Sequence, residues 1–275
     1  SRVTACKPAN AIACPYHAWT YDLDGRLAHV PHRDAFAGLE RGRDLAPVHV
    51  VVKHGFVFAA LTAFDIDAFL APIADDLALF AAESCVVHAH SARDVAANWK
   101  LLVDAFLDGY HIRVLHKDSM GRFFVDGVLG ADRAGVHIRA VTARKTLFEV
   151  RDAARVDALD VRAFATPSYL VFPSTILIMH PDYTSVMRIV PVAAARTRFE
   201  HVMITKTAPA NDAEREHFDK SFALIDDGVF AREDLVICER IQRGLATGAS
   251  DDVVYGDLES ASLWFHDGVD RALAR

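Results

Sequence analysis

Two groups of side chains stand out because their residue types and spacing suit a metal ion. In the first group, Cys14 and His17 are three positions apart and Pro15 fixes the turn between them. A thiolate and an imidazole on one loop form half of a metal site, either for zinc or for an iron–sulfur cluster in which histidine replaces cysteine on one iron. By spacing alone, a buried free cysteine beside a hydrogen-bonded histidine explains the pair at least as well.

The second group is Asp108, His111 and His116, in a segment of helical periodicity that begins at the N-cap residue Asn98. At about 100° per residue, Asp108 and His111 share one helix face, whereas His116 is about 140° away from His111. Both imidazoles therefore reach one ion only if the helix breaks, and we expect that break at Ile112–Leu115. By spacing alone, a solvated Asp108–His111 pair and an unrelated His116 are the simpler explanation.

The elements around the first group are short strands and turns. A hairpin is predicted over residues 21–27, where Asp24-Gly25 suits a tight turn, and a second hairpin over residues 48–61. From residue 65 to residue 83 the apolar side chains recur at helical spacing. We therefore expect one domain over residues 1–64 and another over residues 65–275.

The second domain reads as a sheet with helices at both ends. A strand is predicted near residues 85–96, followed by the helix from Asn98, by an irregular glycine-containing stretch at 119–135, and by a long helix from Asp212 to Arg243 that Gly244 ends. Further strands are expected at 135–150, 168–180, 185–192 and 197–207. This order indicates the α+β class.

Composition excludes several classes of protein. The 275 residues include 30 basic and 37 acidic side chains, for a net charge of −7, and 52% hydrophobic residues, which is typical of a globular protein. Because the chain has no basic block, we expect no nucleic-acid partner. Its apolar runs are shorter than a membrane span, and it lacks a secretion signal, so we expect no membrane contact and a cytoplasmic location.

The segment from Cys14 to Gly25 resembles the second ligand loop of the Rieske-type iron–sulfur domains of ring-hydroxylating oxygenases. The resemblance implies that Cys14 and His17 bind a [2Fe-2S] Rieske cluster, whose other two ligands come from an earlier Cys-x-His loop. Only 13 residues precede Cys14, and Cys6 is followed by Lys7 and Pro8 instead. We therefore expect the chain to start just after that loop, through truncation or through true loss, and to hold an incomplete ligand set.

Two further segments resemble the catalytic domain of the same family. These are Asn98-Trp99-Lys100 and Asp108-Gly109-Tyr110-His111. The resemblance implies that His111 and His116 bind a mononuclear Fe(II). It also implies that Asp108 conducts electrons to that iron from the Rieske histidine of a neighbouring subunit.

A carboxylate is expected as the third ligand, because two histidines and one carboxylate leave positions open on Fe(II) for O2. The long C-terminal helix offers four candidates, Asp226, Asp227, Glu233 and Asp234. The segment from Glu233 to Leu245 resembles the family segment in which the aspartate of Glu-Asp is the ligand. The resemblance therefore implies Asp234.

As a whole, the chain resembles the alpha subunit, or terminal oxygenase component, of the Rieske non-heme iron oxygenases. The implied fold is a partial β Rieske module followed by a helix-grip (START/Bet v1-like) antiparallel sheet around a long C-terminal helix. The implied reaction uses NAD(P)H electrons, delivered by a reductase or ferredoxin, to activate O2 and hydroxylate an aromatic or other apolar small molecule. The implied assembly is a homotrimer.

Two other functions remain open at this stage. A zinc hydrolase could use the same two histidines and aspartate with a bound water. A helix-grip protein that has lost electron transfer could bind a small molecule without catalysis. Metal content separates the three readings, since they require iron, zinc and no metal respectively.

Overall fold

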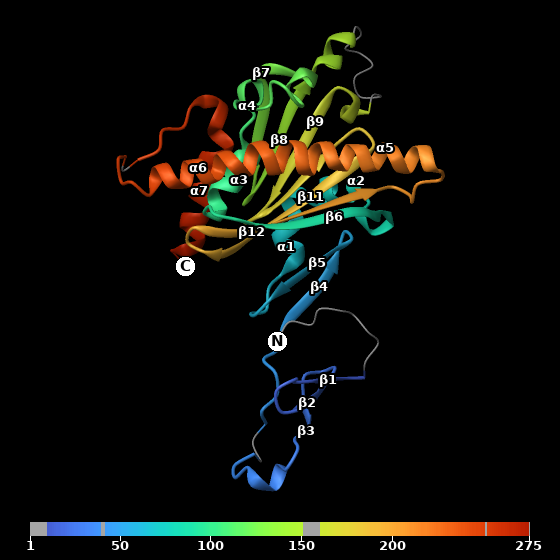
Figure 1. Cartoon of the computed structure of the whole chain (residues 1–275), viewed down its shortest axis with the longest axis vertical. Helices are drawn as coiled ribbons and strands as arrows, with labels where there is room; N and C mark the ends of the chain where they lie inside the picture. The colour runs from blue at the N-terminus through green and yellow to red at the C-terminus, as the bar shows by residue number, and fades with distance from the viewer. Residues whose placement is uncertain (1–9, 40–41, 151–159, 251, 275) are drawn as a thin grey trace. The chain divides into compact units, whose positions relative to one another are not determined.

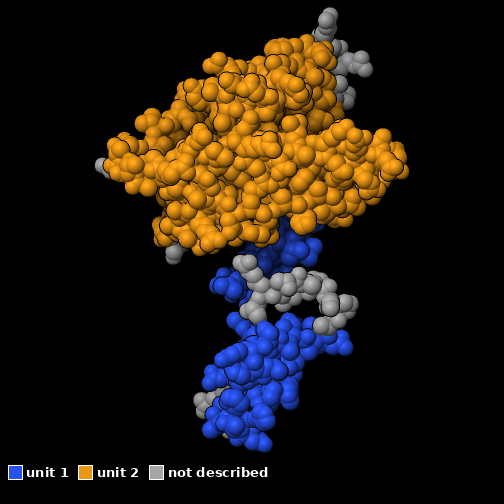
Figure 2. Space-filling view, viewed as in Figure 1, with its two compact units in different colours: residues 1–69 blue, residues 70–275 orange. Residues whose placement is uncertain are grey.

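The computed structural model describes residues 10–39, 42–150, 160–250 and 252–274. The chain divides into two compact units, residues 1–69 and residues 70–275 (Figure 2). The division falls within helix α1 (Ile66–Leu70), a few residues after the boundary expected from the sequence. Among the described residues, no helix combines the length and the apolar character that crossing a membrane requires.

The first unit contains the two predicted hairpins. Strands β1 (Ala11–Ala13), β2 (Thr20–Asp22) and β3 (Leu27–His29) form an antiparallel sheet, while β4 (His49–Lys53) and β5 (Phe56–Ala60) form a separate pair. Gly25, with φ of 82°, allows the turn between β2 and β3. His54 and Gly55 have φ of 49° and 78°, and they make the tight turn that closes the second hairpin.

The second unit is built on one antiparallel sheet of seven strands. Its spatial order is β6 (Val86–Val95), β12 (Arg196–Thr205), β11 (Tyr183–Ala193), β10 (Thr175–Met179), β9 (Ala165–Val171), β8 (His137–Arg144) and β7 (Phe124–Ala134). Helices lie against the sheet, as the expected α+β class requires.

A long helix runs across one face of this sheet (Figure 1). It consists of α5 (Asp212–Ala223), a π-helical segment η8 (Leu224–Asp234) and α6 (Leu235–Leu245). The long helix predicted from the sequence is thus confirmed, except that Gly244 does not end it, because α6 continues to Leu245. The π-helical turns within it are a feature that apolar periodicity does not reveal. The other helices of this unit are α2 (Ala74–Phe80), α3 (Trp99–Leu107), α4 (Ile112–Leu115) and α7 (Ser260–Leu273).

The core lies between the sheet and helices α3, η8, α6 and α7. Phe199 on β12 is fully buried, stacks on Phe106 of α3 and meets Phe230 of η8 edge to face. Leu170 on β9 belongs to the same core as Phe199. Because side chains alternate along a strand, its neighbour Tyr169 points to the other face of the sheet. There its ring packs on Phe80 of α2.

Two local predictions were wrong. Residues 119–135 are not irregular, because β7 occupies Phe124–Ala134 and pairs with β8. Gly127, with φ of 67°, lies where the register of β7 shifts. This glycine therefore marks an irregularity inside a strand and not a loop.

The helix break also falls earlier than expected. Helix α3 ends at Leu107, whereas Ile112–Leu115 is itself the short helix α4. Asp108 leaves the helix in an extended conformation, and its side chain accepts a hydrogen bond from the backbone of Tyr110. This Asx-type contact offers the backbone an alternative to the next helical turn.

Candidate metal centre

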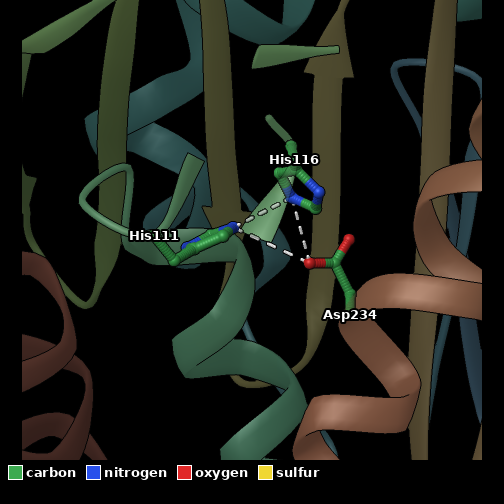
Figure 3. A group of neighbouring side chains, drawn as sticks. All are labelled: His111, His116 and Asp234. Atoms are coloured by element: carbon green, nitrogen blue, oxygen red, sulfur yellow. Dashed lines mark hydrogen bonds and ion pairs between the residues drawn. The ribbon is translucent and has the colours of Figure 1, made fainter. Parts of the chain in front are cut away.

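His111, His116 and Asp234 converge on one point (Figure 3). His111 precedes α4, His116 follows it, and Asp234 is the last residue of η8. His111 Nε2 lies 3.1 Å from His116 Nε2 and 3.7 Å from Asp234 Oδ1, and His116 Nε2 lies 3.2 Å from Asp234 Oδ1. The structure therefore brings together the three residues for which the sequence implied a shared metal.

These distances fit three donors on a single ion. Donors bound at about 2.1 Å lie about 3.0 Å apart at right angles and about 3.4 Å apart in a tetrahedron. The observed separations of 3.1 and 3.2 Å lie within that range, and the third, 3.7 Å, is slightly longer. In addition, Asp234 Oδ1 is buried and makes no hydrogen bond in the described part of the protein, so a cation is the partner its environment lacks.

Each histidine is held by a carboxylate on its other ring nitrogen. Asp108 Oδ2 lies 3.0 Å from His111 Nδ1, and Glu233 Oε2 lies 2.6 Å from His116 Nδ1. Ser119 also donates a hydrogen bond to Glu233, at 2.8 Å. Such carboxylate partners keep the proton on Nδ1, so both Nε2 atoms present lone pairs to a metal.

Burial and charge act in opposite directions on His116. Burial by itself lowers the pKa of this imidazole, but the neighbouring carboxylates of Asp234 and Glu233 outweigh burial and raise it. Two negative groups around one imidazole form an environment that favours a positive charge, either a proton or a metal ion.

Two glycines allow the chain to bend closely around the site. A Cβ on Gly121 would lie 2.8 Å from the backbone oxygen of His116, and a Cβ on Gly109 would lie 3.2 Å from Leu129. Gly121 therefore permits the loop after α4 to close over His116. Gly109 permits the turn between Asp108 and His111.

A cavity of about 80 Å³ opens beside the three residues. Its polar wall includes Thr142, Thr166, Ser168 and His180, and its aromatic wall includes Phe106, Phe124 and Phe230. No sequence motif singles out His180, because it lies far from His111, His116 and Asp234 along the chain.

The other carboxylates considered as third ligand lie elsewhere. Asp226 is buried against Arg93 and His201, and the side chain of Asp227 is 67% exposed. Glu233 contacts Nδ1 of His116 and not Nε2, which is the nitrogen that lies near His111 and Asp234. Cys238 packs behind the site, where burial raises the pKa of its thiol to about 12, so the thiol stays protonated.

In the first unit, Cys14 and His17 lie on the loop between β1 and β2. The loop is closed by hydrogen bonds from Cys14 N to Trp19 O and from Ala18 N to Cys14 O. Cys14 is half-buried, and His17 is exposed with its ring against Tyr16. Cys6 lies outside the described residues.

The class of protein follows from comparison with known families. Residues 82–275 match the family of the ring hydroxylating alpha subunit (catalytic domain), and residues 3–50 match the Rieske [2Fe-2S] domain. The chain belongs to the Rieske oxygenase alpha-subunit family. This agrees with the resemblance drawn from its motifs.

The chain is also similar to individual proteins of known name. The glycine betaine monooxygenase oxygenase subunit of Chromohalobacter salexigens is 34% identical over 49% of this chain and 31% of its own length. The carnitine monooxygenase oxygenase subunit of Acinetobacter pittii is 28% identical over 87% of this chain and 64% of its own length. The chain thus spans between about a third and two thirds of these two relatives.

A solved structure has the same fold. The crystal structure of the quaternary ammonium Rieske monooxygenase CntA with an inhibitor aligns with a TM-score of 0.78, at 20% identity, over 97% of this chain and 72% of that chain.

Proposed function

We propose that this chain is the oxygenase component of a Rieske non-heme iron system and that it hydroxylates a small molecule. The observation that carries this proposal is the convergence of His111, His116 and Asp234, with each imidazole backed by a carboxylate. Fe(II) bound by these three residues would supply O2 activation, because a set of two histidines and one carboxylate leaves coordination positions open.

The protein's own contribution is to position the ligands and to exclude water. Asp108 and Glu233 fix the orientation of His111 and His116, and the phenylalanines of the cavity keep the site apolar. By family resemblance, Asp108 also has the role of passing electrons toward His111 from the Rieske cluster of a neighbouring subunit in a trimer. A reductase or ferredoxin is the proposed source of those electrons.

The Rieske cluster requires four protein ligands, and Cys14 and His17 supply two. No Cys-x-His pair occurs in this sequence. We therefore assign Cys14 and His17 as the half-site of the cluster and derive no step of the reaction from it.

The substrate that we propose carries a quaternary ammonium group. Glycine betaine and carnitine appear in the names of the relatives above. Cavity volume does not distinguish a compact molecule from a multi-ring one, because a cavity of about 940 Å³ also reaches His111 and Asp234, in addition to the cavity of about 80 Å³ described above. Three phenylalanines in its wall suit a cation, which is attracted to aromatic faces.

Metal analysis comes first among the tests. The chain is purified from cells grown with iron, and iron, zinc and acid-labile sulfide are measured per chain. We expect about one iron at the His111, His116 and Asp234 centre. Zinc at this centre would instead support the hydrolase, whose tetrahedral geometry the same distances accommodate, and a chain that takes up neither metal would support a binding protein.

Substrate choice is tested on the iron-loaded chain. Calorimetric titrations with glycine betaine, L-carnitine and naphthalene compare the two substrate classes by binding, which does not depend on a complete Rieske cluster. We expect binding of a quaternary ammonium compound. Binding of naphthalene alone would overturn this substrate class and restore the aromatic one.

A further inference from the structure

A row of buried polar side chains connects η8 with the cavity of the metal centre. Asp226 Oδ1 lies 2.9 Å from His201 Nδ1, and His201 Nε2 lies 3.0 Å from Ser185 Oγ. Ser185 Oγ in turn lies 3.2 Å from His180 Nε2. The four residues are between 0% and 8% exposed, and His180 also lines the cavity beside His111.

The sheet fixes the spacing of this row. His201 on β12 pairs with Ser91 on β6, and Ser185 on β11 pairs with Ile178 on β10, two residues before His180. Phe222 stacks on the His201 ring, and Phe230 meets the same ring edge to face. The row is therefore held by strand register and shielded by aromatic side chains from α5 and η8.

Asp226 sets the direction of the hydrogen bonds. Burial by itself raises the pKa of this carboxyl, but hydrogen bonds from His201 and Ser91 and the charge of Arg93 outweigh burial and lower it. An ionised carboxylate only accepts hydrogen bonds, so His201 Nδ1 carries a proton. The other nitrogen, Nε2, accepts from Ser185 when His201 is neutral and donates to Ser185 when His201 is charged.

His180 is the residue at the cavity end. Burial, with help from the positive charges of His201 and Arg144, lowers the pKa of His180 to about 3, so its ring is neutral and carries one proton. Because Ser185 engages Nε2, the atom left for a molecule in the cavity is Nδ1. A hydroxyl both donates and accepts, so Ser185 allows two opposite orientations of the whole row.

We propose that His201, Ser185 and His180 form a proton relay that carries one proton from His201 to an oxygen atom of a molecule bound in the cavity. Before transfer, His201 holds both ring protons, Ser185 donates to His180 Nε2, and His180 holds its proton on Nδ1. On transfer, the Nδ1 proton bonds to the ligand oxygen, the Ser185 proton moves to His180 Nε2, and the His201 Nε2 proton moves to Ser185. His201 ends neutral, and no electron is exchanged.

Several charged groups surround this relay. Arg93 contacts Asp226 and lies 3.8 Å from the exposed Asp227. Near the cavity end, Arg144 acts on His180, and Asp182 acts on Arg144. Ser91 is half-buried and donates to Asp226 at 2.6 Å.

The role of the relay in turnover rests on the proposed function, because an oxygen atom that gains electrons must also gain protons. The relay itself needs neither iron nor substrate. Its first test can therefore be made on the metal-free chain and is independent of oxygenase activity.

The test is ¹⁵N NMR of the histidine side chains in the whole metal-free chain between pH 5 and pH 9, with His180→Gln and His201→Gln used for assignment. We expect His180 to exchange its Nδ1–H form for its Nε2–H form at the pH where His201 loses its proton. In Ser185→Ala this response of His180 should vanish. Thr197→Val, which removes another fully buried hydroxyl from β12, should retain it.

Three results would overturn the relay. They are a His201 ring that does not titrate in this range, a His180 ring that ignores the titration of His201, and a coupled response that persists in Ser185→Ala. Once a substrate is identified, Ser185→Ala in a chain with a completed cluster ligand set should also lower kcat by about 10²-fold with little change in KM, as expected for lost proton transfer. Absence of activity in that completed chain, with intact coupling, would count against the proposed function and not against the relay.

Discussion

Glu233 and Asp234 are neighbours in the chain, yet they contact opposite nitrogens of the same imidazole. Glu233 Oε2 lies 2.6 Å from His116 Nδ1, and Asp234 Oδ1 lies 3.2 Å from His116 Nε2. The end of the π-helical segment thus holds His116 from both sides. Glu233 fixes the orientation of the ring, and Asp234 lies beside Nε2, the nitrogen available to a metal.

Loss of any of the three converging side chains should abolish metal binding. We expect His111→Ala, His116→Ala and Asp234→Ala to fold and to contain less than about a tenth of the native iron, because two remaining donors hold Fe(II) weakly. Elemental analysis with circular dichroism checks this expectation. Asp227→Ala, on the same helix but exposed, should keep its iron. Native iron content in Asp234→Ala would refute this assignment of the centre.

Glu233→Gln should weaken metal binding without removing it. A carboxylate behind a ligating histidine typically changes metal affinity by about 10- to 100-fold. Competition with a chelator measures the change. Glu216→Gln is the matched control, because Glu216 is an exposed carboxylate on α5 that pairs with Lys220. Equal affinities of Glu233→Gln and the native chain would show that the contact at 2.6 Å has no influence on the metal.

Metal affinity should fall as the pH is lowered. His116 must be neutral to bind a metal, and its pKa in the metal-free chain is raised above the ordinary value of 6.5. The affinity is therefore fully present above that raised pKa, and it falls by about tenfold per pH unit below it. Metal titrations between pH 5.5 and pH 9 should give a midpoint above 6.5, and Glu233→Gln should move this midpoint downward.

Asp108→Asn should separate metal binding from electron delivery. The amide can still contact His111, so we expect nearly native iron content. If Asp108 passes electrons to the iron, oxygen uptake driven by NADH and a reductase should fall by at least about tenfold when the substitution is made in a chain whose cluster ligand set is completed by a Cys-x-His loop. Unchanged uptake would remove Asp108 from the electron path, and loss of iron would show that its role is structural.

Phe199→Ala should destabilise the second unit by about 3–5 kcal/mol, which is the usual cost of removing a buried phenylalanine. Phe199 is fully buried and links β12 to Phe106 of α3 and Phe230 of η8. Urea unfolding measures this loss. Phe148→Ala removes a phenylalanine that is 73% exposed and should change stability by less than about 0.5 kcal/mol. Similar losses in both variants would contradict this account of the core.

Local sequence was sufficient for the elements whose signals lie within a few residues. Asp24-Gly25 predicted the first hairpin, and Asn98 predicted the start of α3, where its side chain accepts from Lys100 N. Helical periodicity predicted the long helix over residues 212–243. The motifs around Asp108, His111 and Glu233-Asp234 also predicted the family, since each of them is a short continuous segment.

Tertiary structure decided how these segments meet. The end of α3 at Leu107 depends on a hydrogen bond from Tyr110 to Asp108, which competes with helical periodicity over the same residues. Helical spacing also cannot distinguish Asp226 from Asp234. Only the π-helical geometry and the packing of η8 direct the first toward His201 and the second toward His116.

The relay of His180, Ser185 and His201 shows most clearly which contacts the local sequence does not determine. One local sign existed, since His201 alternates with Phe199 and Met203 on β12 and must share their buried face. Its partners, however, come from other strands and from η8, at separations from 16 to 25 residues along the chain. The residue types and local turns were thus determined by the sequence alone, whereas every long-range contact at the site required the register of the sheet and the packing of the long helix across it.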